Sequence, residues 1–462
     1  MARYGAVEAF VDPDDARRGQ YEDERAALLA AETKDEEAVR RNGHATLTSS
    51  VSNLANTIIG SGMLTFPLVL ASAGIIPGIL TCLLAGSVSA FGLYLLSVCA
   101  RHTPHRRASF FAVANLTFPR AAVFFDVHSP IIFDAGRLTE DSFLIILKSL
   151  VPSVVASLYH DLAPERSPPE WAIDGRLWLT LLMIVLVPLC FMRHLHSLRH
   201  MSYVSLFSVG AEDVTVYLIL IVIVCYFVPL EGMPPRGEVY IVKITSNFVS
   251  TFPVLVFAFT CAMNIFPIYN EVKTNSQARM NIIITSAIGS ATLIYGVIAV
   301  FGYLTFGSNV GANIVAMYPA TSLFVAVGQL AIAVLVLFSY PLQVHPCRNC
   351  LDKVFHFNTT AAPGELGGDD GDHTASESEM TPFKFFVLTM AIVASGFWIA
   401  FFVDDLQMVL SFVGSTGSTA ISFILPGLFY WKMFGNEPGA NKTLTRAAVA
   451  LATYGGFILV FW

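Results

Sequence analysis

The stretch N-T-I-I-G-S-G-M-L-T-F-P, Asn56 to Pro67, decides how this chain folds. It lies within an apolar segment at residues 48–72, where a helix that faced only lipid would carry Leu and Val. Glycine-rich and proline-containing backbone is tolerated at membrane depth only where it lines a cavity or is buried in protein. Small residues also favour a packing seam between helices, but a seam needs only spaced small residues. Because Asn, Thr, Gly and Pro crowd into this short stretch, we predict a membrane helix that is broken near its middle.

Apolar segments of similar length recur along the rest of the chain. Of the 462 residues, 55% are hydrophobic and only 13% are charged, whereas soluble domains average about 25% charged residues. A bilayer span needs about 20 predominantly apolar residues. The segments predict an all-α polytopic membrane protein with about eleven transmembrane helices, at residues 48–72, 75–99, 120–151, 174–192, 201–229, 247–269, 281–306, 320–343, 383–403, 406–432 and 443–462.

Polar segments and positive charges place these spans relative to the lipid bilayer. Residues 1–45 are charged and poor in aromatic residues, which predicts a disordered cytosolic tail ahead of a transmembrane domain at residues 46–462. Residues 358–381 are rich in Gly, Asp and Ser and predict a disordered cytosolic loop. Lys and Arg accumulate in alternate loops, which predicts a cytosolic N-terminus. They are spread too thinly to form the basic face of a nucleic-acid-binding protein, so no nucleic acid is expected as a partner.

A second segment has the same character as the first. The span at residues 247–269 carries Ser250, Pro253, Asn264 and Pro267 among its apolar residues. Corresponding interruptions in the two halves of a transporter are the best sequence pointer to its binding site. Spans one and six are five apart, which suits two inverted repeats of five helices with span eleven added. At such breaks, free carbonyls can coordinate a cation, and the N–H groups that open the next half-helix can hold a carboxylate.

Five motifs carry a resemblance to a known family. They are N-T-I-I-G-S-G-M-L-T-F-P (Asn56 to Pro67), F-P-V-L-V-F-A-F-T-C (Phe252 to Cys261), N-I-F-P-I-Y-N-E (Asn264 to Glu271), G-Y-L-T-F-G-S-N-V (Gly302 to Val310) and S-Y-P-L-Q-V-H-P-C-R (Ser339 to Arg348). Together they closely resemble the amino acid/auxin permease family over roughly residues 45–460. Within that family, the chain resembles the fungal vacuolar amino-acid transporters, relatives of the animal sodium-coupled neutral amino-acid transporters. The resemblance implies a LeuT-like fold, secondary transport of amino acids and a vacuolar or lysosome-like membrane, with the plasma membrane as the alternative.

The resemblance also implies where the functional residues lie. The family's substrate site falls on residues of spans one and six, namely Thr57, Gly60, Ser61, Gly62, Phe259, Thr260 and Asn264. Its sodium site, where one exists, falls on Asn56 and Ser339. Fungal vacuolar members are generally regarded as proton coupled, so we expect H⁺, with Na⁺ as the alternative coupling ion. No Lys or Arg lies in spans one or six to pair with an acidic side chain, and we therefore expect a neutral amino acid as substrate.

Three features depart from the family pattern. Ala262 and Met263 stand where the family often has His-Gln. The third span, at residues 120–151, and the fifth, at residues 201–229, hold carboxylates where apolar residues are expected. A carboxylate near the bilayer centre costs about 2.5–3.5 kcal/mol by insertion scales and usually marks an ion pathway. The candidate proton carriers are therefore Asp126, Glu212 and Asp213.

Other interpretations of the same features stay open. In the third span, the charges could pair with one another, as Asp134 or Asp141 with Arg137, the span boundary could be shifted, or the segment could be foreign to the family. A sensor of the same fold, which binds an amino acid without moving it, is the alternative to a transporter. An enzyme is disfavoured because no nucleophile, acid–base pair or metal set converges. Cys347 and Cys350 form a C-x-x-C without the four ligands of a zinc site, so no metal or cofactor is expected. The sequence does not fix the oligomeric state.

Overall fold

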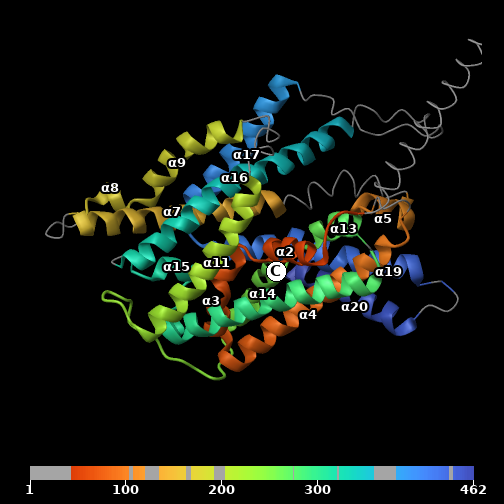
Figure 1. Cartoon of the computed structure of the whole chain (residues 1–462), viewed down its shortest axis with the longest axis horizontal. Coiled ribbons are helices and arrows are strands. Elements are labelled where there is room, and N and C mark those ends of the chain that lie inside the picture. The colour runs from red at the N-terminus through yellow and green to blue at the C-terminus, as the bar shows by residue number, and fades with distance from the viewer. Residues whose placement is uncertain are drawn as a thin grey trace, which may run out of the picture.

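The protein is all-helical (Figure 1). The computed structural model describes residues 43–103, 108–119, 135–162, 168–191, 203–273, 275–319, 322–357, 381–435, 437 and 441–461. Within these ranges no β-strand occurs, and the one β contact is an isolated bridge between Ala45 and Val272. The predicted all-α class is confirmed. The predicted tail and loop lie outside the described residues, apart from the end of the tail around Ala45 and Thr381 at the end of the loop.

The first predicted span is made of three short helices. They are α2 (Leu47–Ile58), the 3-10 helix η1 (Ser61–Thr65) and α3 (Phe66–Ala73). The other helices follow in order: α4 (Ile75–Ala100), α5 (Phe110–Thr117), α7 (Ala135–Leu162), α8 (Glu170–Ile173), α9 (Gly175–Cys190), α11 (Tyr203–Phe227), η3 (Ser246–Thr251), α12 (Phe252–Ala258), α13 (Ala262–Glu271), α14 (Gln277–Phe306), η4 (Gly307–Asn309), α15 (Ile314–Met317), α16 (Leu323–Phe357), α17 (Pro382–Phe402), α18 (Leu406–Val413), η5 (Gly414–Ser418), η6 (Ala420–Ile424), α19 (Leu425–Phe434) and α20 (Lys442–Phe461).

Most of the predicted spans reach the length of a membrane crossing. Eight of the described helices are long and apolar enough to cross a membrane, and the bent pair of α2 with η1–α3 makes nine if it counts as one span. Two shorter apolar helices, Gly175–Cys190 and Asp213–Phe227, coincide with the predicted fourth and fifth spans. The multi-span architecture is therefore confirmed for the described part of the chain, whereas the count of eleven is not reached by length and composition.

The third predicted span needs a correction. The sequence places it at residues 120–151, whereas α7 continues to Leu162 and its apolar window is Asp141–Tyr159. The predicted boundary stops before Pro152, but this proline lies inside α7. Proline is tolerated within a membrane helix because neighbouring groups satisfy the backbone that it leaves free. The boundary was therefore wrong at its C-terminal end.

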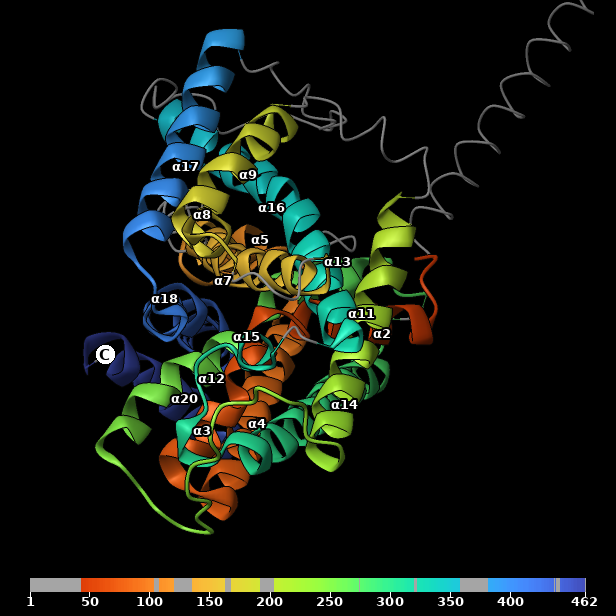
Figure 2. The ribbon, with the colours of Figure 1, turned by 90° about the vertical axis from the view of Figure 1, so that its left-hand side faces the viewer.

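The helices form two groups, which lie in the upper and lower parts of Figure 2. In the first group, α7, α9, α16 and α17 all pack against one another. In the second group, α14 packs against α2, α3 and α4. Helix α12 packs against η1, which brings both interrupted spans into the second group. Helix α18 packs against both α7 and α12 and so joins the two groups.

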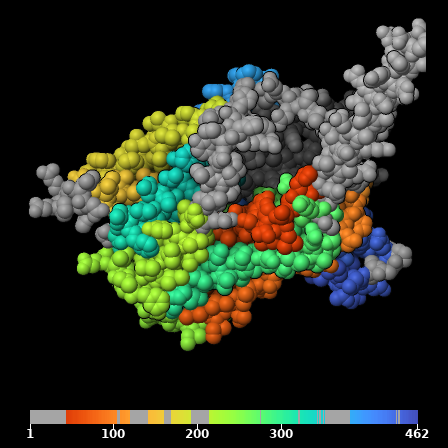
Figure 3. Space-filling view, in the orientation of Figure 1, coloured from red at the N-terminus to blue at the C-terminus, as the bar shows by residue number. Residues whose placement is uncertain are grey.

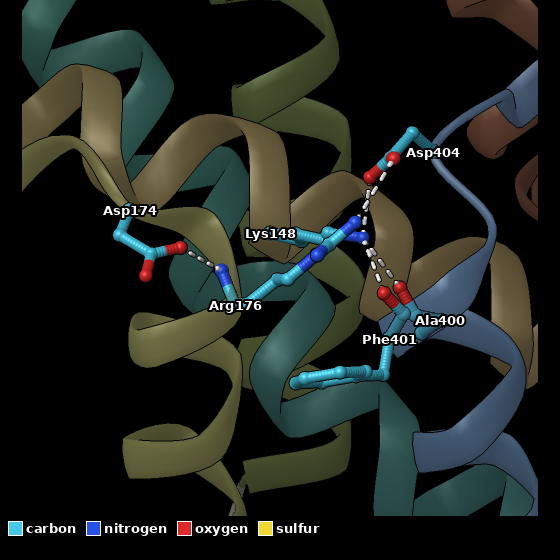
Figure 4. Close-up of polar contacts among 6 residues, drawn as sticks. All are labelled: Lys148, Asp174, Arg176, Ala400, Phe401 and Asp404. Carbon is cyan, nitrogen blue, oxygen red and sulfur yellow. Dashed lines mark hydrogen bonds and ion pairs between the residues drawn. The ribbon is translucent and has the colours of Figure 1, made fainter.

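A buried lysine fastens the first group at one end (Figure 4). Lys148 of α7 is 8% exposed, and its Nζ donates to the carbonyls of Ala400 at 2.8 Å and Phe401 at 3.1 Å. Its Nζ also lies 2.5 Å from Oδ1 of Asp404, and Arg176 of α9 lies 3.8 Å from the other carboxylate oxygen. The last carbonyls of a helix lack intrahelical donors and carry partial negative charge. Lys148 therefore caps the end of α17 and ties it to α7.

A buried arginine joins α17 to its neighbours nearer the other end of that helix. Arg348 of α16 is 2% exposed, and its Nη1 donates to the carbonyl of Cys190 at 3.3 Å and to Oγ1 of Thr389 at 3.1 Å. Its guanidinium carbon lies 4.0 Å from the centre of the Phe385 ring. Cys190 ends α9, whereas Thr389 and Phe385 belong to α17. Arg348 therefore joins three helices of the first group, and its charge has a structural explanation.

Candidate functional site

The first break lies between α2 and η1. The two parts of the span are bent by 50° relative to each other. Gly60 between them has extended backbone, with φ −146° and ψ −153°. After the break, the Met63 N–H donates to the Gly60 carbonyl, and the Thr65 hydroxyl donates to the Gly62 carbonyl. Pro67 lies in the first turn of α3, where a residue without an N–H is favoured. The predicted break in the first span is confirmed.

The second break lies between α12 and α13. Residues 259–261 separate the two helices, although the whole segment Ser246–Glu271 passes as one span without a comparably sharp bend. The hydroxyl of Thr260 donates to the Val256 carbonyl at 2.7 Å. The freed carbonyl of Phe259 accepts a hydrogen bond from Oγ of Ser89, on α4, at 2.9 Å. A neighbouring helix thus satisfies backbone that the interruption exposes.

The two breaks lie against each other at a glycine. A Cβ atom added to Gly62 would lie 2.7 Å from Cβ and 2.8 Å from Cα of Ala258. Only a residue without a side chain allows η1 to approach α12 so closely. Gly60 is different, because a Cβ atom added there would have the Ile58 carbonyl oxygen, at 4.0 Å, as its nearest neighbour. The backbone of Gly60 therefore faces open space, whereas Gly62 fills a tight contact.

Two of the predicted substrate residues meet across the breaks. Nδ2 of Asn264, in the first turn of α13, donates to Oγ1 of Thr57, in the last turn of α2, at 2.5 Å. The Thr57 hydroxyl in turn donates to the Asn53 carbonyl at 2.9 Å. The opposite ends of the same helices meet at the bridge between Ala45 and Val272. Helices α2 and α13 are therefore joined near the breaks and again at their far ends.

A tyrosine that the sequence did not single out lies between the breaks. Oη of Tyr295, on α14, lies 2.6 Å from the carbonyl oxygen of Ile58 and 3.0 Å from that of Ala258. Its ring stacks on Phe66 at 4.3 Å and meets Phe259 edge-on at 5.3 Å between centroids. No motif marks Tyr295 in the sequence, because its role depends on two chain segments that are far apart in the sequence.

The remaining predicted substrate residues surround this contact. Phe259 is buried, Ser61 and Thr260 are partly buried, and Gly60 is exposed. The structure thus brings the seven predicted residues to two adjoining breaks, with aromatic rings on one side and open space at Gly60 on the other. Such a site offers backbone N–H groups, carbonyls and hydroxyls, and no charged side chain of spans one or six lies at the breaks. Their role in binding stays a prediction.

The predicted ion-coupling residues are more dispersed. Asn56 is partly buried on α2, and Oγ of Ser339 donates to the Leu335 carbonyl within α16 at 2.8 Å. Asp213 is exposed on α11. Glu212 belongs to the same helix, but its side chain lies outside the described residues, as does all of Asp126. A sodium site and a proton path at these residues stay predictions.

One buried carboxylate lies in the first group of helices. Asp141 of α7 is fully buried, and Oδ1 of Asp141 lies 3.0 Å from the position that a Cβ atom on Gly396 of α17 would take. The hydroxyl of Tyr340, on α16, lies 3.3 Å from that same position. In the sequence, Asp141 stands out only as a possible partner for Arg137, whose side chain lies outside the described residues. Asp141 therefore joins the carboxylates to be tested for coupling.

Known proteins resemble the chain over most of its length. The family described as "Transmembrane amino acid transporter protein" matches residues 43–462. Vacuolar amino acid transporter 5 of Schizosaccharomyces pombe is 38% identical over 427 residues, which cover 90% of this chain and 93% of the relative. Vacuolar amino acid transporter 6 of Saccharomyces cerevisiae is 30% identical, with 90% of this chain and 96% of the relative covered. The resemblance carried by the motifs is confirmed. The chain belongs to the transmembrane amino acid transporter family, a family of transporters and not of enzymes.

Proposed function

We propose that this protein is a secondary active transporter of neutral amino acids, which works by alternating access in a vacuolar membrane. The observation that carries the proposal is the meeting of two interrupted helices, joined by Asn264 and Thr57 beside open space at Gly60. Discontinuous helices that face each other at the membrane midplane are the usual binding site of such transporters. The LeuT-like arrangement of two inverted five-helix repeats and the count of eleven spans belong to the same proposal.

The substrate would be held by its two charged ends. Its carboxylate would meet the N–H groups around Gly60 to Gly62, at the positive end of the following half-helix. Its ammonium group would meet carbonyls and hydroxyls at the second break, such as that of Thr260. A neutral side chain is proposed because the helices on both sides of the breaks carry no Lys or Arg. Tight binding of a decarboxylated amine analogue would contradict this placement.

Alternating access is supported by the way in which the half-helices are joined. On one side of the breaks, α2 and α13 are linked at Thr57 and Asn264 and at the bridge of Ala45 with Val272. On the other side, α3 is linked to the segment that leads into η3, because the Thr245 N–H donates to the Ser72 carbonyl at 2.9 Å. Each pair of half-helices could therefore tilt as a unit, with the breaks as hinges.

The vacuolar membrane and proton coupling are proposed on separate grounds. The relatives described above are named vacuolar amino acid transporters. A vacuole maintains an acidic interior, and a proton gradient can drive a carrier. The proposed proton carriers are Asp126, Glu212 and Asp213, and a sodium site at Asn56 and Ser339 is the alternative.

Counterflow tests the proposed transport against the sensor of the same fold. The purified chain would be reconstituted into liposomes loaded with unlabelled neutral amino acid, and entry of the labelled amino acid would be measured. A transporter shows transient accumulation of label above the external concentration. A protein that binds the labelled amino acid but shows no exchange would be a sensor, and the proposal would then be wrong.

A further inference from the structure

The hydroxyl of Tyr295 lies within hydrogen-bond distance of the carbonyls that end both α2 and α12. In a continuous helix, the Ile58 carbonyl would accept the N–H of Gly62, and the Ala258 carbonyl would accept that of Ala262. At the breaks, the hydroxyl of Tyr295 takes the place of both N–H donors, with its Oη 2.6 Å from the Ile58 carbonyl oxygen and 3.0 Å from that of Ala258. The two carbonyls come from segments that are far apart in the sequence. Tyr295 therefore joins the two interruptions directly.

The hydroxyl has a single proton for two acceptors. A tyrosine O–H donates one hydrogen bond, so the carbonyls of Ile58 and Ala258 share the proton and cannot both be fully satisfied. Buried carbonyls without a donor are unfavourable. The distance between the Ile58 and Ala258 carbonyls is therefore limited, because both must stay within hydrogen-bond distance of the same Tyr295 oxygen.

The ring of Tyr295 is held in place by its surroundings. Tyr295 is fully buried, and its ring is stacked on Phe66 and in edge contact with Phe259. Phe66 opens α3 and Phe259 is the first residue of the second break, so the ring also contacts both interrupted spans. Because the ring is confined, its hydroxyl cannot easily move with the carbonyl at one break if the carbonyl at the other break stays in place.

We propose that Tyr295 is a positioning residue that sets the separation of the two breaks. It does so without touching the substrate. The N–H groups at the first break would meet the carboxylate of the amino acid, and the groups at the second break would meet its ammonium. The separation of the breaks thus decides whether both ends of one amino acid are bound at once. The inference rests on the proposed function, because it concerns the same binding site.

The test compares Tyr295→Phe with Tyr303→Phe in the purified full chain. Tyr303 lies on the same helix and is equally buried, but its hydroxyl accepts from the Tyr240 N–H at 2.9 Å, away from the breaks. The probe is labelled L-leucine or L-glutamine, whichever the wild type binds more tightly. Loss of one hydrogen bond that positions both breaks is expected to raise Kd by about tenfold. Tyr303→Phe removes a hydrogen bond that lies away from the breaks, so it is expected to change Kd by less than about twofold.

Two outcomes overturn the inference. If Tyr295→Phe lowers the melting temperature but leaves Kd within about twofold of wild type, the hydroxyl has only a structural role. If Tyr295→Phe does not fold, Phe66→Leu is measured instead, because it loosens the ring stack and keeps the hydroxyl. That variant is expected to raise Kd by about threefold or more, and an unchanged Kd overturns the inference. A wild type that binds without counterflow refutes transport alone, since the effect on Kd is still measured.

Discussion

Alanine at Gly62 and alanine at Gly60 should have opposite effects on stability, although the two glycines are two residues apart. At Gly62 the added Cβ would lie 2.7 Å from Cβ of Ala258, and carbon atoms pack at about 3.5–4.0 Å. The two breaks must therefore separate by about 1 Å. Overpacking of this kind costs about 1–3 kcal/mol. The displacement would also lengthen the hydrogen bond between Asn264 and Thr57 and those of the Tyr295 hydroxyl to the two breaks.

Gly60→Ala is the matched control. Its extended backbone suits alanine, and the added Cβ meets no atom closer than 4.0 Å. Replacing a glycine at a compatible position stabilises a protein by about 0.4–1 kcal/mol through the unfolded chain. The same methyl group would occupy the space in which we place the substrate carboxylate. We therefore expect Gly60→Ala to keep or raise the melting temperature and to weaken amino acid binding.

Thermal unfolding and equilibrium binding of labelled amino acid, measured on the same purified samples, distinguish these effects. Gly62→Ala should lose both stability and binding, whereas Gly60→Ala should lose binding alone. Wild-type stability of Gly62→Ala would refute the close packing of the two breaks. Wild-type binding by Gly60→Ala would show that the open space at Gly60 is not part of the binding site.

Two further predictions rest on the described contacts, and a third concerns the candidate proton carriers. A double-mutant cycle of Thr57→Ala and Asn264→Ala should give a coupling of about 0.5–1.5 kcal/mol in amino acid binding, and additive losses would mean that their hydrogen bond does not contribute. Lys148→Met should lower stability by about 1.5–3 kcal/mol because the charged group that caps α17 is lost. Asp404→Asn should cost less stability, since Lys148 keeps its two carbonyl partners. Thermal unfolding should therefore show a larger loss for Lys148→Met than for Asp404→Asn. The candidate carriers can be replaced by amides in the variants Asp126→Asn, Asp141→Asn, Glu212→Gln and Asp213→Asn. At least one of these variants should change the pH dependence of transport. Unchanged pH profiles in all four would remove these carboxylates from the mechanism.

The interruptions were visible in the sequence because their cause is local. Glycine, proline and polar residues within an apolar run cannot form an ordinary lipid-facing helix, so the break near Gly60 and the one between α12 and α13 could both be located. The family resemblance was equally accessible, because long motifs occur in a fixed order. The seven substrate residues were placed by that resemblance, and the structure brings them to adjoining positions.

Features that depend on distant contacts could not be predicted. Gly60 and Gly62 look alike in the sequence and differ only in whether Ala258 lies opposite them. Tyr295 is one of several polar residues in its span, and only the folded chain shows that its hydroxyl reaches both breaks. The predicted third span ends at residue 151, whereas α7 continues through Pro152 to Leu162, because a packed membrane helix can accommodate a proline.

Accumulation of amino acid against its concentration gradient tests the central claim most directly. The wild-type chain would be reconstituted into liposomes with an imposed pH gradient of either orientation, in buffer without sodium, and uptake of labelled neutral amino acid would be followed. The account predicts accumulation above the external concentration in one orientation and its loss when a protonophore collapses the gradient. Strict dependence on sodium would contradict proton coupling. Mere equilibration under every H⁺ and Na⁺ gradient would contradict secondary active transport itself.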